Sequence, residues 1–164
     1  MAEKAQAPTW GEGAVADRLA ELGLERPAVA APVGSYVPAI RDGDLVLTSG
    51  QLPFVAGSLP ATGKVGADVS AERAQELARV CAVNAVAAVH ELIGDLDRVA
   101  QVVKVVGFVA SDPSFTGQPG VLNGASDVLA EIFGEAGRHA RSAVGVAVLP
   151  LDAPVEVEIT VRVR

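Results

Sequence analysis

Residues 154–164 read PVEVEITVRVR, and this alternation constrains the fold more than any other feature of the chain. Every second residue is Val or Ile, and the residues between them are charged or polar. Because side chains of a β-strand point alternately to the two faces of a sheet, the segment predicts a strand with one buried and one polar face. Such a sheet needs a second layer to cover its apolar face.

Two segments with the apolar spacing of amphipathic helices can supply that layer. The first begins at Ser70, a residue type that caps helix N-termini, and runs to about Ile93 before Gly94. The second covers residues 121–133 and ends at Gly134. Their apolar stripes are Leu77, Cys81, Asn84, Ala88 and Leu92 in the first, and Val121, Ala125, Val128, Leu129, Ile132 and Phe133 in the second.

Four other runs rich in β-branched residues predict the remaining strands. The first two are joined by an Asp-Gly pair, which favours a hairpin. The order β-β-α-β-α-β-β, behind a short helix at 14–22, predicts an α+β fold with a mixed sheet and both main helices on one face. The four runs cover residues 36–40, 45–49, 98–110 and 142–149, and a Gly-rich surface loop is expected at 54–68.

The residues between the last two strands, 149–154, favour a turn, so we expect these strands to pair as an antiparallel hairpin. The alternation then puts Val144, Val146 and Val148 on the covered face, and Arg141, Ala143, Gly145 and Ala147 on the open face. An open face this small and apolar predicts packing against another subunit.

The charge balance argues against several classes of partner. The chain has 13 Lys and Arg against 20 Asp and Glu, a net charge of −7. Such a surface repels phosphates and anionic lipids, so we expect neither nucleic acid nor a membrane as partner. No apolar run is long enough to span a bilayer and no export signal is present, which favours a cytoplasmic location.

The cysteine and histidines point to no redox or metal chemistry. Cys81 is the single cysteine, which excludes an intramolecular disulfide and fits a reducing compartment. Its place on a helix stripe indicates an inert core thiol. His90 and His139 have no cysteines or paired acids at ligand spacing, so we expect no metal site.

The segment 137–150, GRHARSAVGVAVLP, concentrates positive charge in an acidic chain. Arg141 stands among small residues, where a guanidinium can fork onto a carboxylate; the alternative is a structural ion pair with one of the many acids. Arg138 and His139 are interpreted as solvated turn residues. Glu156 would lie nearly opposite Arg141 in the expected hairpin and could share its pocket, or it is simply the polar half of an alternating strand.

Several motifs together resemble the RidA/YjgF family of small trimeric proteins. They are VGSYVPA, LVLTSGQLP, the Asn of VLNGASDVLAEIFGE, ARSAVGVAVLP and PVEVEI, in order and roughly in spacing over residues 33–163. The most specific part runs from Arg141 to Glu158. The resemblance divides the chain into an N-terminal extension with a short helix, 1–32, and a RidA/YjgF-like domain, 33–164.

The resemblance implies a chorismate-mutase-like fold, a trimeric barrel and ligand sites in clefts between subunits. Active members hydrolyse reactive 2-enamino and 2-imino acids to 2-oxo acids and ammonia without a cofactor. The carboxylate-binding arginine falls on Arg141, the water-positioning glutamate on Glu156, and the pocket tyrosine, serine and asparagine on Tyr36, Ser49 and Asn123.

The chain also departs from the compact members of that family. Its loop after SGQLP is longer by about four residues on the usual family spacing, it has the additional N-terminal helix, and Ala143 stands where deaminases often have Cys. These features resemble a longer subgroup. The alternative function is therefore a trimer that binds a small carboxylate metabolite without turning it over.

Overall fold

The predicted order of helices and strands is the order found in the computed structural model, which describes residues 7–32 and 34–164. The start of the expected family domain, Val33, and the first six residues of the expected extension lie outside the described residues. The helices are α1 (Ala14–Glu21), α2 (Ala71–Ile93) and α3 (Gln118–Phe133), and the strands are β1 (Ala39–Asp42), β2 (Leu45–Thr48), β3 (Val99–Ala110), β4 (Ala140–Val146) and β5 (Val155–Val163).

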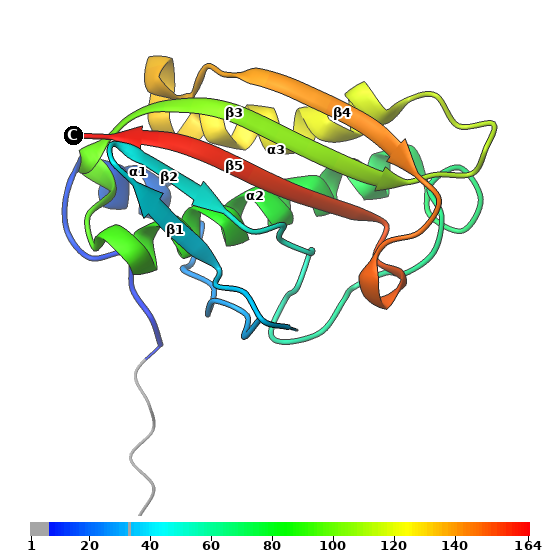
Figure 1. The fold of residues 1–164 in the computed structure, drawn as a ribbon, viewed down its shortest axis with the longest axis horizontal. Coiled ribbons are helices and arrows are strands. Elements are labelled where there is room, and N and C mark those ends of the chain that lie inside the picture. Colours follow the sequence, from blue (N-terminus) through cyan, green and yellow to red (C-terminus); the bar gives the residue numbers. More distant parts are fainter. Residues whose placement is uncertain (1–6, 33) are drawn as a thin grey trace, which may run out of the picture.

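The strands form one mixed sheet in the order β1-β2-β5-β3-β4, and α2 and α3 cover one of its faces (Figure 1). The β3–β4 pair is parallel and the other pairs are antiparallel. The alternation of β5 is confirmed, because its five Val and Ile residues are buried against the helices. This is the predicted α+β arrangement.

The predicted hairpin of the last two strands is wrong. β4 pairs only with β3, while β5 pairs with the opposite edge of β3. The reason is the helix-length connection through α3, which returns the chain beside β3 in the same direction, as in a β-α-β unit. Residues 149–154 do form a turn, with Leu151 and Asp152 at positive φ, but that turn carries the chain past β3.

The predicted faces of β4 are also reversed. Ala143 packs on the core, and a Cβ added at Gly145 would touch Gln118 at the start of α3. Val144, by contrast, is 44% exposed on the open face. In the register with β3, Arg141, Ala143 and Gly145 lie beside the buried Val105, Gly107 and Val109, so they share the covered face and Val144 points outward.

Helix α2 is buried more completely than its predicted stripe, since the sheet, α3 and the chain around residues 24–31 and 54–57 surround it. Cys81 is fully buried, as predicted, and burial raises the pKa of its thiol. Leu92 was placed on the stripe but is 44% exposed near the C-terminal end of the helix. The expected surface loop at 54–68 also contributes to the core, because Val65 is fully buried and bridges to Ser111.

The N-terminal extension is packed onto this layer at two points. The side chain of Asp97 accepts hydrogen bonds from the first backbone N–H groups of α1, from Ala14 at 2.9 Å and Val15 at 2.8 Å. Trp10 is buried, and its ring lies edge-on to that of His90 in α2, with the ring centroids 5.7 Å apart. The extension therefore adds to the helical layer and leaves the other sheet face open.

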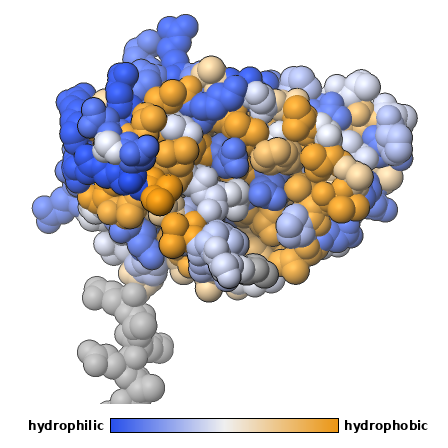
Figure 2. Space-filling model, viewed as in Figure 1, coloured by the Kyte–Doolittle hydropathy of each residue, from blue (hydrophilic) through white to orange (hydrophobic). Residues whose placement is uncertain are grey.

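That open face carries exposed apolar side chains among polar ones (Figure 2). Ile40 of β1 is 59% exposed, and its neighbours Leu45 and Leu47 of β2 are also exposed. Phe108 of β3 and Val144 of β4 lie on the same face at the other side of the sheet. The polar side of β5 lies between these two apolar groups, and exposed apolar patches of this kind favour contact with another chain.

The contact between α2 and α3 depends on Gly124, and two glycines of α3 provide a matched test. A Cβ at Gly124 would overlap the backbone oxygen of Gln75, whereas a Cβ at Gly120 would meet nothing within 4 Å. We predict that Gly124→Ala lowers the free energy of unfolding by about 1–3 kcal/mol, because backbone must shift. Gly120→Ala should raise it by roughly 0.5–1 kcal/mol through helix propensity.

Urea unfolding followed by circular dichroism measures both changes. Equal effects of the two substitutions would contradict the close helix contact described above.

Candidate functional site

The side chain of Arg141 lies against α3 and is held there by three hydrogen bonds. Its Nη1 donates to Oδ1 of Asn123 at 2.9 Å and to Oγ of Ser126 at 3.1 Å, and its Nη2 donates to the carbonyl of Pro119 at 3.1 Å. No ion pair involves Arg141 within residues 7–32 and 34–164. The structural ion pair that was the alternative for this residue is therefore not found there.

The hydrogen bonds leave part of the guanidinium available. Of its five N–H groups, both on Nη1 and one on Nη2 are used by α3. The Nε–H and the second Nη2–H make no hydrogen bond to the described part of the chain. Two such donors on an unpaired cation suit a two-point contact with a ligand carboxylate. We call Asn123, Ser126 and Arg141 the arginine half-site.

Glu156 of β5 lies on the open face, over the backbone of Gly50. A Cβ added at Gly50 would overlap Oε1 of Glu156, so a larger residue there would displace this carboxylate from its present position. Burial, and to a smaller extent the charge of Glu158, raise the pKa of Glu156. A carboxylate with a raised pKa that is held on a strand has the properties of a general base.

Ser49 directly precedes Gly50 in the chain, and Tyr36 and Gly50 line the same small cavity. The Ser49 hydroxyl donates to the carbonyl of Val37 at 2.6 Å, which leaves its oxygen lone pairs available as acceptors. Tyr36 is 49% exposed and lines a small cavity of about 50 Å³ together with Gly50. We call Tyr36, Ser49 and Glu156 the acidic half-site.

Within one chain, the arginine half-site and the acidic half-site lie at separate places on the sheet. Arg141 pairs with Val105 on one side of β3, and Glu156 pairs with Phe108 on its other side. Arg141 and Glu156 are therefore two strand spacings apart across the sheet and three residues apart along the strands. Each of these separations is about 10 Å. Arg141 also faces the helices while Glu156 faces outward, so the predicted opposition of these residues in a hairpin is wrong.

His139 is not the solvated turn residue that the sequence suggested. Its ring is half-buried, with Nε2 2.9 Å from Oγ of Ser126 and Nδ1 2.6 Å from the carbonyl oxygen of Gly137. Arg138 does project into solvent, where it pairs with Glu135 at 3.2 Å. Sequence reasoning missed Ser126 as well, although it lies one helical turn beyond Asn123 and so shares its face.

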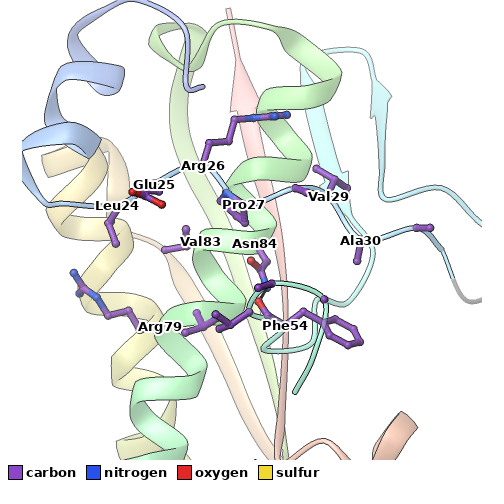
Figure 3. A pocket seen from close by; sticks show the side chains of 16 residues that line it. Leu24, Glu25, Arg26, Pro27, Val29, Ala30, Phe54, Arg79, Val83 and Asn84 are labelled. Carbon is purple, nitrogen blue, oxygen red and sulfur yellow. Dashed lines mark hydrogen bonds between the residues drawn. The ribbon is translucent and has the colours of Figure 1, made fainter. Parts of the chain in front are cut away.

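A cavity of about 750 Å³ lies on the helical side, between α2 and residues 24–31 and 54–57 (Figure 3). Its walls are mostly apolar and it contains none of the predicted site residues. Both of its guanidinium groups are paired, Arg79 with Glu131 at 2.7 Å and Arg26 with Glu91 at 3.1 Å. It therefore lacks the unpaired cation that distinguishes the arginine half-site.

The described residues gather no cluster of three or more His, Cys, Asp or Glu side chains that could hold a metal ion. Within the same residues, no helix has both the length and the apolar character needed to cross a bilayer.

Comparison with known families gives a match over residues 16–161 to the family described as "YjgF/chorismate_mutase-like, putative endoribonuclease". Protein TCP17 of Trypanosoma cruzi is 48% identical over 155 residues, which cover 93% of this chain and 96% of that protein. The 2-iminobutanoate/2-iminopropanoate deaminase of Escherichia coli K12 is 36% identical over 135 residues, covering 80% of this chain and 91% of the deaminase.

Solved structures show the same fold. Atu1372 of Agrobacterium tumefaciens, a protein of unknown function, superposes with a TM-score of 0.84 at 46% identity, covering 92% of this chain and 93% of Atu1372. E. coli TdcF with bound serine has a TM-score of 0.60 at 28% identity, covering 81% of this chain and 91% of TdcF.

The raised pKa of Glu156 predicts a pH-dependent effect of Glu156→Gln on stability. The native state binds this proton more tightly than the unfolded state, so the ionised side chain destabilises the fold. Below about pH 4, near the unfolded pKa, this cost is absent; it grows as pH rises toward the native pKa. We expect Glu156→Gln to gain stability relative to the wild type over that window and to keep the gain at neutral pH.

Urea unfolding from pH 3.5 to 8 measures the difference, and the same change at exposed Glu12 controls for the loss of one negative charge. If the stability difference between Glu156→Gln and the wild type does not increase with pH, the raised pKa of Glu156 is contradicted.

Proposed function

The chain belongs to the YjgF/chorismate mutase-like family, and from this premise we propose that it hydrolyses reactive 2-enamino and 2-imino acids to 2-oxo acids and ammonia. The observation that carries the proposal is the guanidinium of Arg141, which has no ion pair and two unused N–H groups among residues 7–32 and 34–164. A small carboxylate fits those donors. Deaminase activity in the E. coli relative and serine bound to TdcF support this class of ligand.

We place the reaction in clefts between the subunits of a homotrimer. Arg141 of one subunit binds the substrate carboxylate with Asn123, and the neighbouring subunit supplies Tyr36, Ser49 and Glu156. The separation of the half-sites within one chain supports this arrangement, because a second copy is needed to unite them. The apolar open face of the sheet supplies a surface for the contact. In this proposal residues 33–164 form the catalytic domain and residues 1–32 are an extension.

The proposed hydrolysis needs only a correctly positioned substrate and one group that transfers protons. An enamine first becomes the imine, as nitrogen loses a proton and the terminal carbon gains one. Water then adds across the C=N bond, with its oxygen bonding to carbon and a proton passing to nitrogen. The C–N bond of this carbinolamine then breaks, releasing ammonia as the hydroxyl becomes the ketone. Glu156 accepts the proton from the attacking water and returns it to nitrogen, while Arg141 fixes the carboxylate. No cofactor takes part.

A second candidate function keeps the same cleft without turnover. Ala143 stands two residues after Arg141, where the RidA/YjgF resemblance leads one to expect Cys in many deaminases. This difference favours a module that binds a small carboxylate metabolite. Calorimetry with 2-oxobutanoate and a deaminase assay on the same sample separate the two functions, because the second requires binding that depends on Arg141 without loss of imine.

Replacement of Arg141 tests the proposed substrate contact. With freshly generated 2-aminoacrylate, Arg141→Ala should lower kcat/KM roughly 10²- to 10³-fold through loss of two charge-assisted hydrogen bonds. Arg138→Ala removes a neighbouring exposed arginine and should leave the rate unchanged. A wild-type rate in Arg141→Ala would remove the residue from the mechanism.

Mixing two inactive variants tests whether the site is shared between subunits. Arg141→Ala and Glu156→Gln homotrimers should each be inactive. Unfolding and refolding them together at equal amounts should restore about a quarter of wild-type activity, since one site in four combines an intact Arg141 with an intact Glu156. Refolding each variant alone is the control. Failure of the mixture, with mixed trimers shown by mass spectrometry, would place both residues in sites of one chain.

A further inference from the structure

A chain of hydrogen bonds runs from the backbone to the guanidinium of Arg141. The carbonyl of Gly137 lies 2.6 Å from Nδ1 of His139, whose Nε2 lies 2.9 Å from Oγ of Ser126. Nη1 of Arg141 lies 3.1 Å from the same Oγ. We call these groups the Arg141 relay. Ser126, His139 and Arg141 are all half-buried.

The chemistry of each group fixes the direction of the relay when the imidazole is neutral. A carbonyl oxygen can only accept, so Nδ1 of His139 carries the hydrogen. The bare Nε2 then accepts from the hydroxyl of Ser126. The oxygen of Ser126 has lone pairs left, and it accepts from Nη1 of Arg141. Each donor is thereby matched to one acceptor.

We propose that Ser126 and His139 are positioning residues, which hold the guanidinium of Arg141 so that its Nε–H and remaining Nη2–H meet a ligand carboxylate. The inference rests on the proposed role of Arg141 in binding substrate. An arginine on an edge strand has many rotamers, and fixing one of them on binding would cost conformational entropy. The relay fixes the rotamer during folding, so carboxylate binding is stronger.

The serine and histidine are not arranged as a nucleophile and its base. Ser126 lies in the interior of α3, where the backbone N–H groups are used within the helix. These N–H groups therefore form no backbone oxyanion site beside its hydroxyl. The oxygen of Ser126 also accepts from Arg141, which makes it a structural acceptor in this arrangement.

The tautomer of His139 provides a direct spectroscopic test. The chain has two histidines, so ¹⁵N-labelled imidazole signals are assigned by comparison with His139→Phe. We expect the Nδ1–H tautomer for His139 in the intact protein, because Nδ1 faces the carbonyl oxygen of Gly137. An Nε2–H tautomer would reverse the direction of the hydrogen bond to Ser126 and would overturn the relay.

Binding and kinetics test the positioning role. Ser126→Ala and His139→Phe should weaken 2-oxobutanoate binding and raise KM for 2-aminoacrylate by about tenfold, the effect of one net hydrogen bond. The value of kcat should change less than about twofold, since neither residue touches the reacting atoms. Ser126→Thr keeps the hydroxyl and should restore binding, and Arg138→Ala should have no effect.

Two further measurements separate positioning from general damage to the fold. Binding of the neutral 2-oxobutanamide should be unchanged in Ser126→Ala, because this ligand has no carboxylate to meet Arg141. In an Arg141→Ala background, Ser126→Ala should cause no additional loss. Equal losses for the acid and the amide, full additivity with Arg141→Ala, or labelling of Ser126 by a fluorophosphonate would each overturn the proposal.

Failure of the relay and failure of the proposed function give different results. If wild type binds 2-oxobutanoate and the relay variants bind it equally well, only the relay is wrong. If wild type binds 2-oxobutanoate through the relay without consuming 2-aminoacrylate, only the catalytic function is wrong. Loss of all 2-oxobutanoate binding in wild type would overturn both.

Discussion

The close packing of α3 against the edge of the sheet is the contact on which the remaining structure depends. Gly107 leaves room for Leu122, Gly124 lets α3 reach the backbone of α2, and Ala143 keeps β4 small beneath the helix. Because the helix comes so near, the guanidinium of Arg141 reaches acceptors on α3. The packing that covers the sheet therefore also orients the cation.

The sheet separates charges that the proposed reaction needs together. Arg141 lies on the helical face of an edge strand and has no paired acid in the part of the chain that the structure describes, and Glu156 lies on the open face with a raised pKa. Neither arrangement stabilises a single chain much, because a cation without a paired acid and a desolvated carboxylate contribute little to stability. In the proposed function, a neighbouring subunit and a ligand carboxylate complete the site. This accounts for the positions of both Arg141 and Glu156.

Residues that look unremarkable in the sequence complete the arginine half-site. His139 follows an exposed arginine in what reads as a turn, and Ser126 is a polar residue in an amphipathic helix. Their contact joins α3 to the residue that precedes β4, through side chains 13 positions apart in the chain. Local sequence patterns do not predict this contact, because the two side chains meet only when the β3–α3–β4 crossover has folded.

The sequence alone determined the helices, the strands, the alternation of β5 and the burial of Cys81, because these depend on local periodicity and on the need to cover apolar side chains. The motifs around Arg141 and Glu156 likewise pointed to the correct family. Only the tertiary structure decided that β4 pairs with β3 and turns its small residues inward. Pairing partners and facing depend on long-range packing, because the register of β4 with β3 fixes which side chains share the covered face.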